Sequence, residues 1–223
     1  MRLLKKVLFA ATLCGAAMAA QASPADPKNG VEYQTLPVAQ ATPAGKKIEV
    51  VEFFAYYCPH CNVLEPALAA WVKKQGDNIV FKRVHVQRDE SVAPQQRLFF
   101  TLEAMGLVEQ LHSKVFQAMH VERNRLNSDE AVFSFVEKQG IDRAKFSDAY
   151  RSFGVAARVR QANAMMGAFK VDSWPMIGID GRFTTSPSMA NEGSKSAQNE
   201  EQLNSQGLAV MDHLVAKAKA EKK

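Results

Sequence analysis

Two cysteines separated by only two residues are the feature that most constrains this chain. Cys58 and Cys61 enclose Pro59 and His60, and they follow a β-branched and aromatic run, residues 47–54, that reads as a buried strand. Pro59 suits the first turn of a helix, where its missing N–H would be unpaired in any case. After the motif, apolar residues recur at helical spacing, at Val63, Leu64, Ala67, Leu68 and Trp71. The sequence therefore predicts a strand that leads into a cysteine pair at the start of a helix.

Redox chemistry explains this pair better than a structural role. A disulfide that closes so small a loop constrains the unfolded chain little, and a chain of 223 residues can bury an adequate core without cross-links. At a helix N-terminus, unpaired N–H groups and the macrodipole stabilise a Cys58 thiolate, the form that attacks in disulfide exchange. We expect His60 to donate a hydrogen bond or a positive charge to that thiolate. We expect Cys61 to be more buried and to resolve the mixed disulfide.

A metal or haem site is the competing interpretation. Structural zinc needs about four ligands, and the remaining histidines form no second ligand pair with zinc-finger spacing. Asn62 follows Cys61, so the C-x-x-C-H pattern of haem attachment is also absent. We therefore predict no metal and no cofactor other than the Cys58–Cys61 disulfide. We expect His85 to be a packed or edge residue, and His112 and His120 to lie on the surface.

The first 22 residues read as a cleaved export signal. Three basic residues within the first six precede an apolar run that ends near residue 18, and Ala20-Gln21-Ala22 fits the cleavage pattern, so the mature chain is expected to start at Ser23. Cys14 would be lost with the signal. Removal of the signal also takes away three of the 28 basic residues and none of the 23 acidic ones, so the formal charge falls from +5 to +2. Such a charge, without basic stretches interleaved with aromatics, argues against nucleic-acid binding.

The rest of the chain reads as an α/β core interrupted by helices. We expect an N-terminal arm over residues 23–46, and a core domain made of residues 47–88 and 171–223. Between the two core segments, residues 89–170 carry apolar residues at helical spacing and are predicted to form an inserted helical domain. Asp180-Gly181 marks the turn of a short hairpin in the second core segment.

A strand followed by C-x-x-C at a helix start is the thioredoxin-like signature, and residues 51–61, Val-Glu-Phe-Phe-Ala-Tyr-Tyr-Cys-Pro-His-Cys, resemble the active-site strand and helix of the DsbA family. These proteins are disulfide oxidases of the bacterial periplasm. The similarity extends in order through residues 85–86, the helical insertion and the hairpin at Pro175. The fold it implies is a thioredoxin fold with a helical domain inserted between its two halves.

The resemblance also implies roles for residues outside the motif. Pro175 matches the family's cis-proline, whose loop faces the cysteines and pairs with a substrate strand. Glu52 and Arg83 match a buried acid–base pair thought to assist proton transfer at Cys61. Since arginine stays protonated, Glu52 would carry such a relay alone. From the residues themselves, the alternative is that Glu52 and Arg83 both lie at solvated positions of their strands.

Trp174 stands before the proline, where family oxidases usually carry valine and isomerases threonine. It is expected to lie against the cysteines, where it would influence redox poise and partner fit, although core packing is the usual role of such a tryptophan. We expect Met176 to line a groove for unfolded substrates, with core packing as the alternative.

Three functions follow from these observations. The first is a periplasmic oxidase, monomeric, that donates its disulfide to reduced, newly exported polypeptides and is reoxidised by a DsbB-like quinone-linked membrane protein, as the resemblance implies. The second is a reductase or isomerase on the same fold, an alternative that is retained because Trp174 replaces the usual residue before the proline. The third is a non-catalytic module that holds unfolded chains or a metal.

Overall fold

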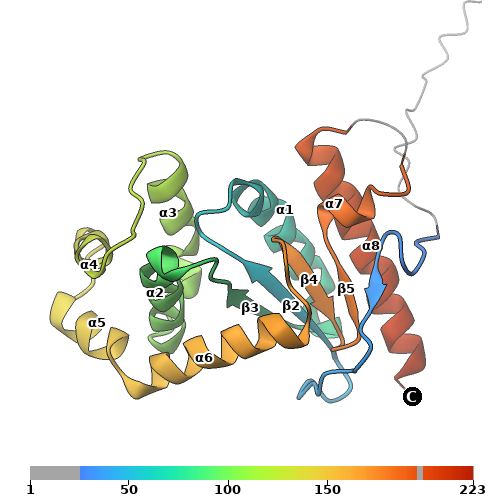
Figure 1. The fold of residues 1–223 in the computed structure, drawn as a ribbon, viewed down its shortest axis with the longest axis horizontal. Helices are drawn as coiled ribbons and strands as arrows, with labels where there is room; N and C mark the ends of the chain where they lie inside the picture. Colours follow the sequence, from blue (N-terminus) through green and yellow to red (C-terminus); the bar gives the residue numbers. More distant parts are fainter. Residues whose placement is uncertain (1–25, 195–197, 223) are drawn as a thin grey trace, which may run out of the picture.

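The computed structural model describes residues 26–194 and 198–222, so the predicted export signal and Cys14 lie outside the described residues. Strands and helices both occur in the two end segments of the chain, and helices alone occupy the middle (Figure 1). The strands are β1 (Gln34–Thr35), β2 (Ile48–Phe54), β3 (Ile79–His85), β4 (Met176–Ile179) and β5 (Phe183–Thr185). The α-helices are α1 (Pro59–Gln75), α2 (Ala93–Ala104), α3 (Val108–His120), α4 (Asp129–Lys138), α5 (Arg143–Tyr150), α6 (Phe153–Ala168), α7 (Pro187–Ala190) and α8 (Glu200–Glu221). Two single 3₁₀ turns, Gly76–Asn78 and Glu90–Val92, precede β3 and α2.

The strands form one sheet in the order β1-β5-β4-β2-β3. β2 and β3 are parallel, with Glu52 opposite Arg83, whereas β4 runs antiparallel to β2 and β5 antiparallel to β4. Every residue of β2 is buried, as the apolar run in the sequence predicts. β1, from the expected N-terminal arm, adds an edge strand beside β5.

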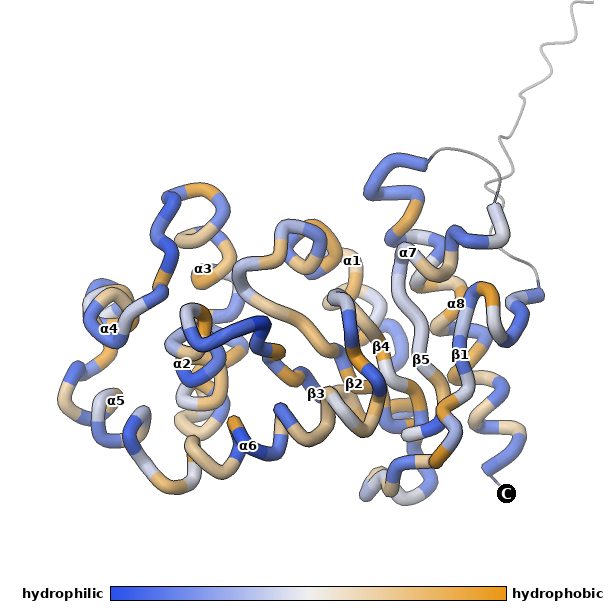
Figure 2. The backbone as a smooth tube through the Cα atoms, viewed as in Figure 1, coloured by the Kyte–Doolittle hydropathy of each residue, from blue (hydrophilic) through white to orange (hydrophobic). Residues whose placement is uncertain are grey.

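Alternate residues of β2 belong to two different hydrophobic clusters, because successive side chains of a strand point to opposite faces. Ile48 and Val50 pack with α1 and α8, and the indole N–H of Trp71 donates to the Asp212 carboxylate across those helices at 2.8 Å. Val51 and Phe53 pack with the helices between β3 and β4. The hydrophobic segments gather along the central strands, whereas the connection from β3 to α2 is hydrophilic (Figure 2).

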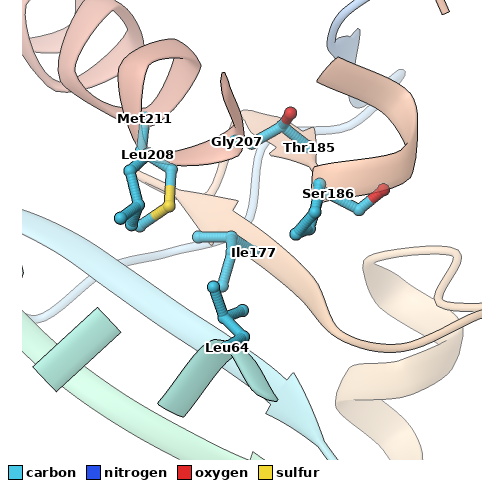
Figure 3. A pocket seen from close by; sticks show the side chains of 8 residues that line it. Leu64, Ile177, Thr185, Ser186, Gly207, Leu208 and Met211 are labelled. Atoms are coloured by element: carbon cyan, nitrogen blue, oxygen red, sulfur yellow. The ribbon is translucent and has the colours of Figure 1, made fainter. Parts of the chain in front are cut away.

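A small pocket between the sheet and α8 shows how closely these layers approach. Leu64 of α1 and Ile177 of β4 lie opposite Leu208 and Met211 of α8 (Figure 3). At Gly207, an added Cβ would lie 3.1 Å from the Cα of Pro187. Glycine at this position therefore lets α8 lie against α7.

The architecture is a thioredoxin fold with helices α2–α6 inserted between β3 and β4, which confirms the predicted fold class. The inserted helices lie together on one side of the sheet, away from α8 (Figure 1). The domain boundaries given above stay a prediction. Within the described residues, no helix is long and apolar enough to cross a membrane.

Candidate active site

Cys58 is the N-cap residue of α1. The chain leaves β2, makes a turn in which the N–H of Cys58 donates to the carbonyl of Ala55 at 3.0 Å, and enters the helix at Pro59. The Cys58 sulfur accepts a hydrogen bond from the backbone N–H of Cys61 at 3.3 Å. A side chain that caps a helix in this way satisfies one of its unpaired N–H groups. The local sequence therefore places the leading sulfur where the helix favours negative charge.

The two sulfurs have opposite acid–base properties. The hydrogen bond with the Cys61 side chain lowers the pKa of Cys58 to about 7 against the opposing effect of burial, and backbone N–H groups and the charge of His60 contribute further. Burial raises the pKa of the Cys61 thiol far above its usual range, and the charges of Cys58 and Glu52 act in the same direction. Cys58 is 5% exposed and Cys61 is fully buried. Cys58 is thus the accessible, thiolate-forming sulfur, and Cys61 is held as a thiol.

The loop before β4 lies against Cys58. The peptide bond between Trp174 and Pro175 is cis, and the Trp174 carbonyl accepts a hydrogen bond from the Cys58 sulfur at 3.5 Å. The Trp174 ring meets the ring of Tyr57 edge-on, with 6.0 Å between centroids. The structure therefore brings Pro175 and Trp174 to the cysteines.

Met176 does not line an open groove. It is 4% exposed, pairs with Phe53 across β4 and β2, and belongs to the hydrophobic cluster under the inserted helices. The hollow beside the cysteines has a volume of about 170 Å³ and is lined instead by His60, Trp174, Pro175, Pro187 and Leu203, with neighbouring polar residues. The expected role of the Met176 side chain in a substrate groove is not supported, because its strand position turns it into the core.

His60 is exposed and forms an ion pair through Nδ1 with the carboxylate of Glu200, the first residue of α8. Asn199 and Gln202 form a capping box that fixes the start of this helix. Sequence reasoning missed Glu200. The capping pattern predicts where a helix starts, but nothing local connects it with a histidine 140 positions earlier.

Glu52 and Arg83 form a buried, hydrogen-bonded acid–base pair, which excludes the solvated positions left open above. Glu52 is 1% exposed, and Nε of Arg83 donates to its carboxylate at 3.0 Å. Arg83 also donates through Nη2 to Glu65 at 2.7 Å. Burial raises the pKa of Glu52 to about 8, even though the charge of Arg83 opposes the shift. Glu52 is therefore a neutral acid near pH 7, while Glu65 balances the charge of Arg83.

His112 is buried, so its expected surface position was wrong. It is 4% exposed, its Nδ1 lies 3.0 Å from the Tyr56 hydroxyl, and its Nε2 lies 3.3 Å from Glu65. His120 is half-buried, with Nε2 2.8 Å from the Tyr56 carbonyl. His85 is packed in the core as expected. Its Nε2 accepts from the backbone N–H of Tyr56, and burial lowers its pKa to about 3.

No group of three or more His, Cys, Asp or Glu side chains in the described part of the chain is arranged to hold a metal ion. The chemistry of the site lies in two sulfurs of unlike acidity, a neutral buried acid behind them, and a cis-proline loop in front. On this fold, such a site defines a thiol–disulfide oxidoreductase of the thioredoxin superfamily.

Comparison with known proteins places the chain within that class. The family model described as DSBA-like thioredoxin domain matches residues 49–204. The thiol:disulfide interchange protein DsbA of Burkholderia cepacia is 40% identical over 185 residues, which cover 82% of this chain and 87% of that protein. The corresponding protein of Bordetella parapertussis is 35% identical and covers 97% of this chain and 100% of that protein. The chain belongs to the DsbA family.

Solved structures agree with this assignment. The crystal structure of Pseudomonas aeruginosa DsbA superposes with a TM-score of 0.77 at 29% identity, and covers 86% of this chain and 94% of that one. A crystal structure of a single-residue variant of the same Pseudomonas protein gives a TM-score of 0.80 at 28% identity, with 87% of this chain and 100% of that one covered.

Proposed function

We propose that this member of the family works as an oxidase, which passes its Cys58–Cys61 disulfide to reduced polypeptides exported to the periplasm. The observation that carries this direction is the contrast between the two sulfurs. Stabilising the Cys58 thiolate favours the reduced form of the protein, so the disulfide becomes a stronger oxidant. No cofactor besides the disulfide takes part.

The reaction proceeds through a mixed disulfide. A polypeptide thiolate attacks the Cys58 sulfur, the Cys58–Cys61 bond breaks, and Cys61 leaves. A second polypeptide thiolate then attacks the polypeptide sulfur of the mixed disulfide and releases the Cys58 thiolate. Two polypeptide thiols are oxidised to one disulfide, and the protein disulfide is reduced to a thiol and a thiolate. In the reverse direction, Cys61 resolves the mixed disulfide by attacking Cys58.

The groups around the sulfurs favour each step. Burial raises the pKa of Cys61, so this sulfur leaves readily only if it takes up a proton as it departs. Glu52 is protonated near neutral pH, because its own pKa is about 8, and supplies the proton that Cys61 takes up. The charge of His60 and the backbone N–H groups of the first turn stabilise Cys58 when it leaves.

The cis-proline loop supports a substrate in extended conformation. The Trp174 carbonyl lies next to the Cys58 sulfur, and Trp174 also lines the hollow together with His60 and Pro187. Backbone groups before Pro175 pair with the polypeptide segment that carries the attacked cysteine. The bulk of Trp174 restricts which residues fit beside it.

The resemblance to the family supplies the remaining elements of the proposal. A DsbB-like membrane protein restores the disulfide by passing the electrons to quinone, the export signal at residues 1–22 delivers the chain to the periplasm, and the protein acts as a monomer. Sedimentation of the mature chain and reoxidation by membranes that contain such a partner test these points.

The equilibrium reduction potential of the Cys58–Cys61 couple in a glutathione buffer tests the direction of the reaction. We expect a potential well above that of glutathione, and rapid oxidation of a reduced secreted protein by the oxidised form. A Cys58→Ser variant should lose this activity. A potential near that of thioredoxin would make the protein a reductant, and full activity of Cys58→Ser would exclude the mechanism.

A further inference from the structure

A second hollow of about 360 Å³ is lined by Tyr57 of the active-site loop and by residues of the inserted helices. Its walls come from the hydrophilic connection between β3 and α2 and from the segment after α3. The lining residues used below are Tyr57, Arg88, Gln95, Arg125 and Asn127. We call it the Arg125 hollow. Tyr57 directly precedes Cys58 and contacts Trp174, so this hollow and the active site share a wall.

Two buried polar atoms in the Arg125 hollow have no hydrogen-bond partner among the described residues. They are the hydroxyl of Tyr57 and Oε1 of Gln95. Gln95 is 2% exposed, and its Nε2 already donates to the carbonyl of Arg125 at 2.8 Å. Buried polar atoms are nearly always paired. The hollow therefore lacks a donor that would satisfy Gln95 Oε1.

The hollow also carries unbalanced positive charge. Arg88 and Arg125 line it, and no acidic residue of the described chain does so. Arg88 is held over the Tyr57 ring, 5.5 Å from its centroid, and its Nε donates to Asp89 at 2.7 Å. No described acidic side chain pairs with Arg125. A guanidinium group without a partner is suited to bind a carboxylate.

Tyr57 contributes a further donor. Burial raises the pKa of its hydroxyl to about 12, although the charge of Arg88 opposes the shift. The hydroxyl is therefore protonated at neutral pH. The hollow thus presents donors for an anion, together with one acceptor for an N–H group.

We propose that the Arg125 hollow binds an acidic residue of the polypeptide substrate, close to the cysteine that forms the mixed disulfide with Cys58. The carboxylate accepts hydrogen bonds from Arg125 and Tyr57, and a backbone N–H of the same segment donates to Gln95 Oε1. A polypeptide supplies both groups at once, and it is the only ligand that must already lie beside Tyr57 during the reaction. This inference rests on the proposed oxidase function and adds a sequence preference to it.

The test uses dithiol peptides that differ only in one Glu or Gln, placed in turn on either side of the reacting cysteine. The rate constant for oxidation by stoichiometric oxidised protein is measured at low and at high salt. For at least one placement we expect the Glu peptide to react about two- to fivefold faster at low salt, the range of an exposed ion pair, and to lose this advantage at high salt.

Arg125→Gln should abolish the advantage, and Arg125→Glu should reverse it. Arg123→Gln is the matched control, because Arg123 lies exposed on the same loop but does not line the hollow. A ratio of one for the wild type at every placement, or an equal loss in Arg123→Gln, would overturn the inference. The Gln peptide separates the two proposals. If all variants fail to oxidise it, the oxidase function itself is wrong, whereas normal oxidation without a Glu preference refutes only the acidic site.

Discussion

At the level of single residues, the site depends on two cysteine thiols that lie in different environments. Cys58 and Cys61 are both buried, but only Cys58 receives hydrogen bonds from the first turn of α1 and the charge of His60. Cys61 lies one turn further along, where burial dominates. The lowered pKa of Cys58 stabilises the reduced form and so gives the couple its direction, whereas Cys61 stays a thiol.

Replacing His60 tests the electrostatic part of this difference. In His60→Ala the positive charge is lost while the backbone N–H remains, so the pKa of Cys58 should rise above about 7. Because the imidazole is exposed, we expect a rise of about half a unit to one unit. Thiolate absorbance against pH measures it. His213→Ala, at the distant part of α8, is the control, and an unchanged Cys58 pKa in His60→Ala would assign the whole shift to the helix and Cys61.

Glu52→Gln tests the buried acid. The folded-state pKa of Glu52 is about 8 against an ordinary 4.5. Between these values the unfolded chain has released a proton that the folded chain retains, so this group lowers stability as pH rises. The glutamine variant should therefore be more stable than the wild type at pH 8, by about 1 to 3 kcal/mol, with little difference at pH 4.5.

Urea unfolding at the two pH values measures this effect. The same variant should oxidise peptides more slowly, since Cys61 loses its proton donor. Arg83 keeps Glu65 as its counter-ion, so the variant leaves no unpaired buried charge. Equal pH dependence in variant and wild type would show that Glu52 is ionised in the folded protein.

At the level of elements, β4 links the active-site loop to the core. It follows Pro175 directly and lies between β2 and β5. Its Gly178 faces Phe169, the residue after α6, so the end of the inserted helices presses on the strand that carries the cis-proline loop. An added Cβ at Gly178 would lie 2.6 Å from a ring carbon of Phe169.

Gly178→Ala should therefore destabilise the fold. Overpacking of a core typically costs about 1–3 kcal/mol. Gly167, inside α6, has open space around its Cβ position. Alanine there should stabilise the protein by about 0.5–1 kcal/mol, because glycine disfavours a helix interior. Denaturant unfolding of the two variants gives the comparison, and equal stabilities would contradict the assigned contact.

At the level of the whole molecule, the redox state and the stability of the fold are linked. An acid whose pKa is lower in the folded state stabilises the protein above its unfolded pKa, and this stabilisation is lost as pH falls through the folded pKa. For Cys58 the unfolded pKa is 9.0 and the folded pKa is about 7. Only the reduced protein has this thiol.

Relative to the oxidised form, the reduced form should therefore gain about 1.5–2 kcal/mol of stability between pH 6 and pH 8.5. Cys61 opposes the gain only close to pH 9 and above, where its unfolded form ionises. Parallel urea unfolding of both forms across this range measures the difference. A constant difference would mean that the folded protein does not stabilise the thiolate.

Most of the fold and the centre of the site could be predicted from the sequence. The run in β2, the proline after Cys58 and the helical spacing behind it are local signals, and local hydrogen bonds place the sulfur at the N-cap. The order of segments was sufficient to predict the inserted helices. The position of Pro175 against the cysteines came from resemblance to a family and not from any local pattern.

Burial and pairing between distant segments were decided by the tertiary structure alone. The alternation in a strand predicts two faces but not what covers them, so the burial of Met176 and the charged partners of Glu52 required the assembled layers. His112 has a polar side chain on a helix, and only the packing of α3 beside Tyr56 turns it inward. Glu200 meets His60 because α8 returns to the start of α1. The sequence determined which groups react, since their chemistry and helix position are local. The tertiary structure determined their acidity, since desolvation and charge depend on neighbours far away in the chain.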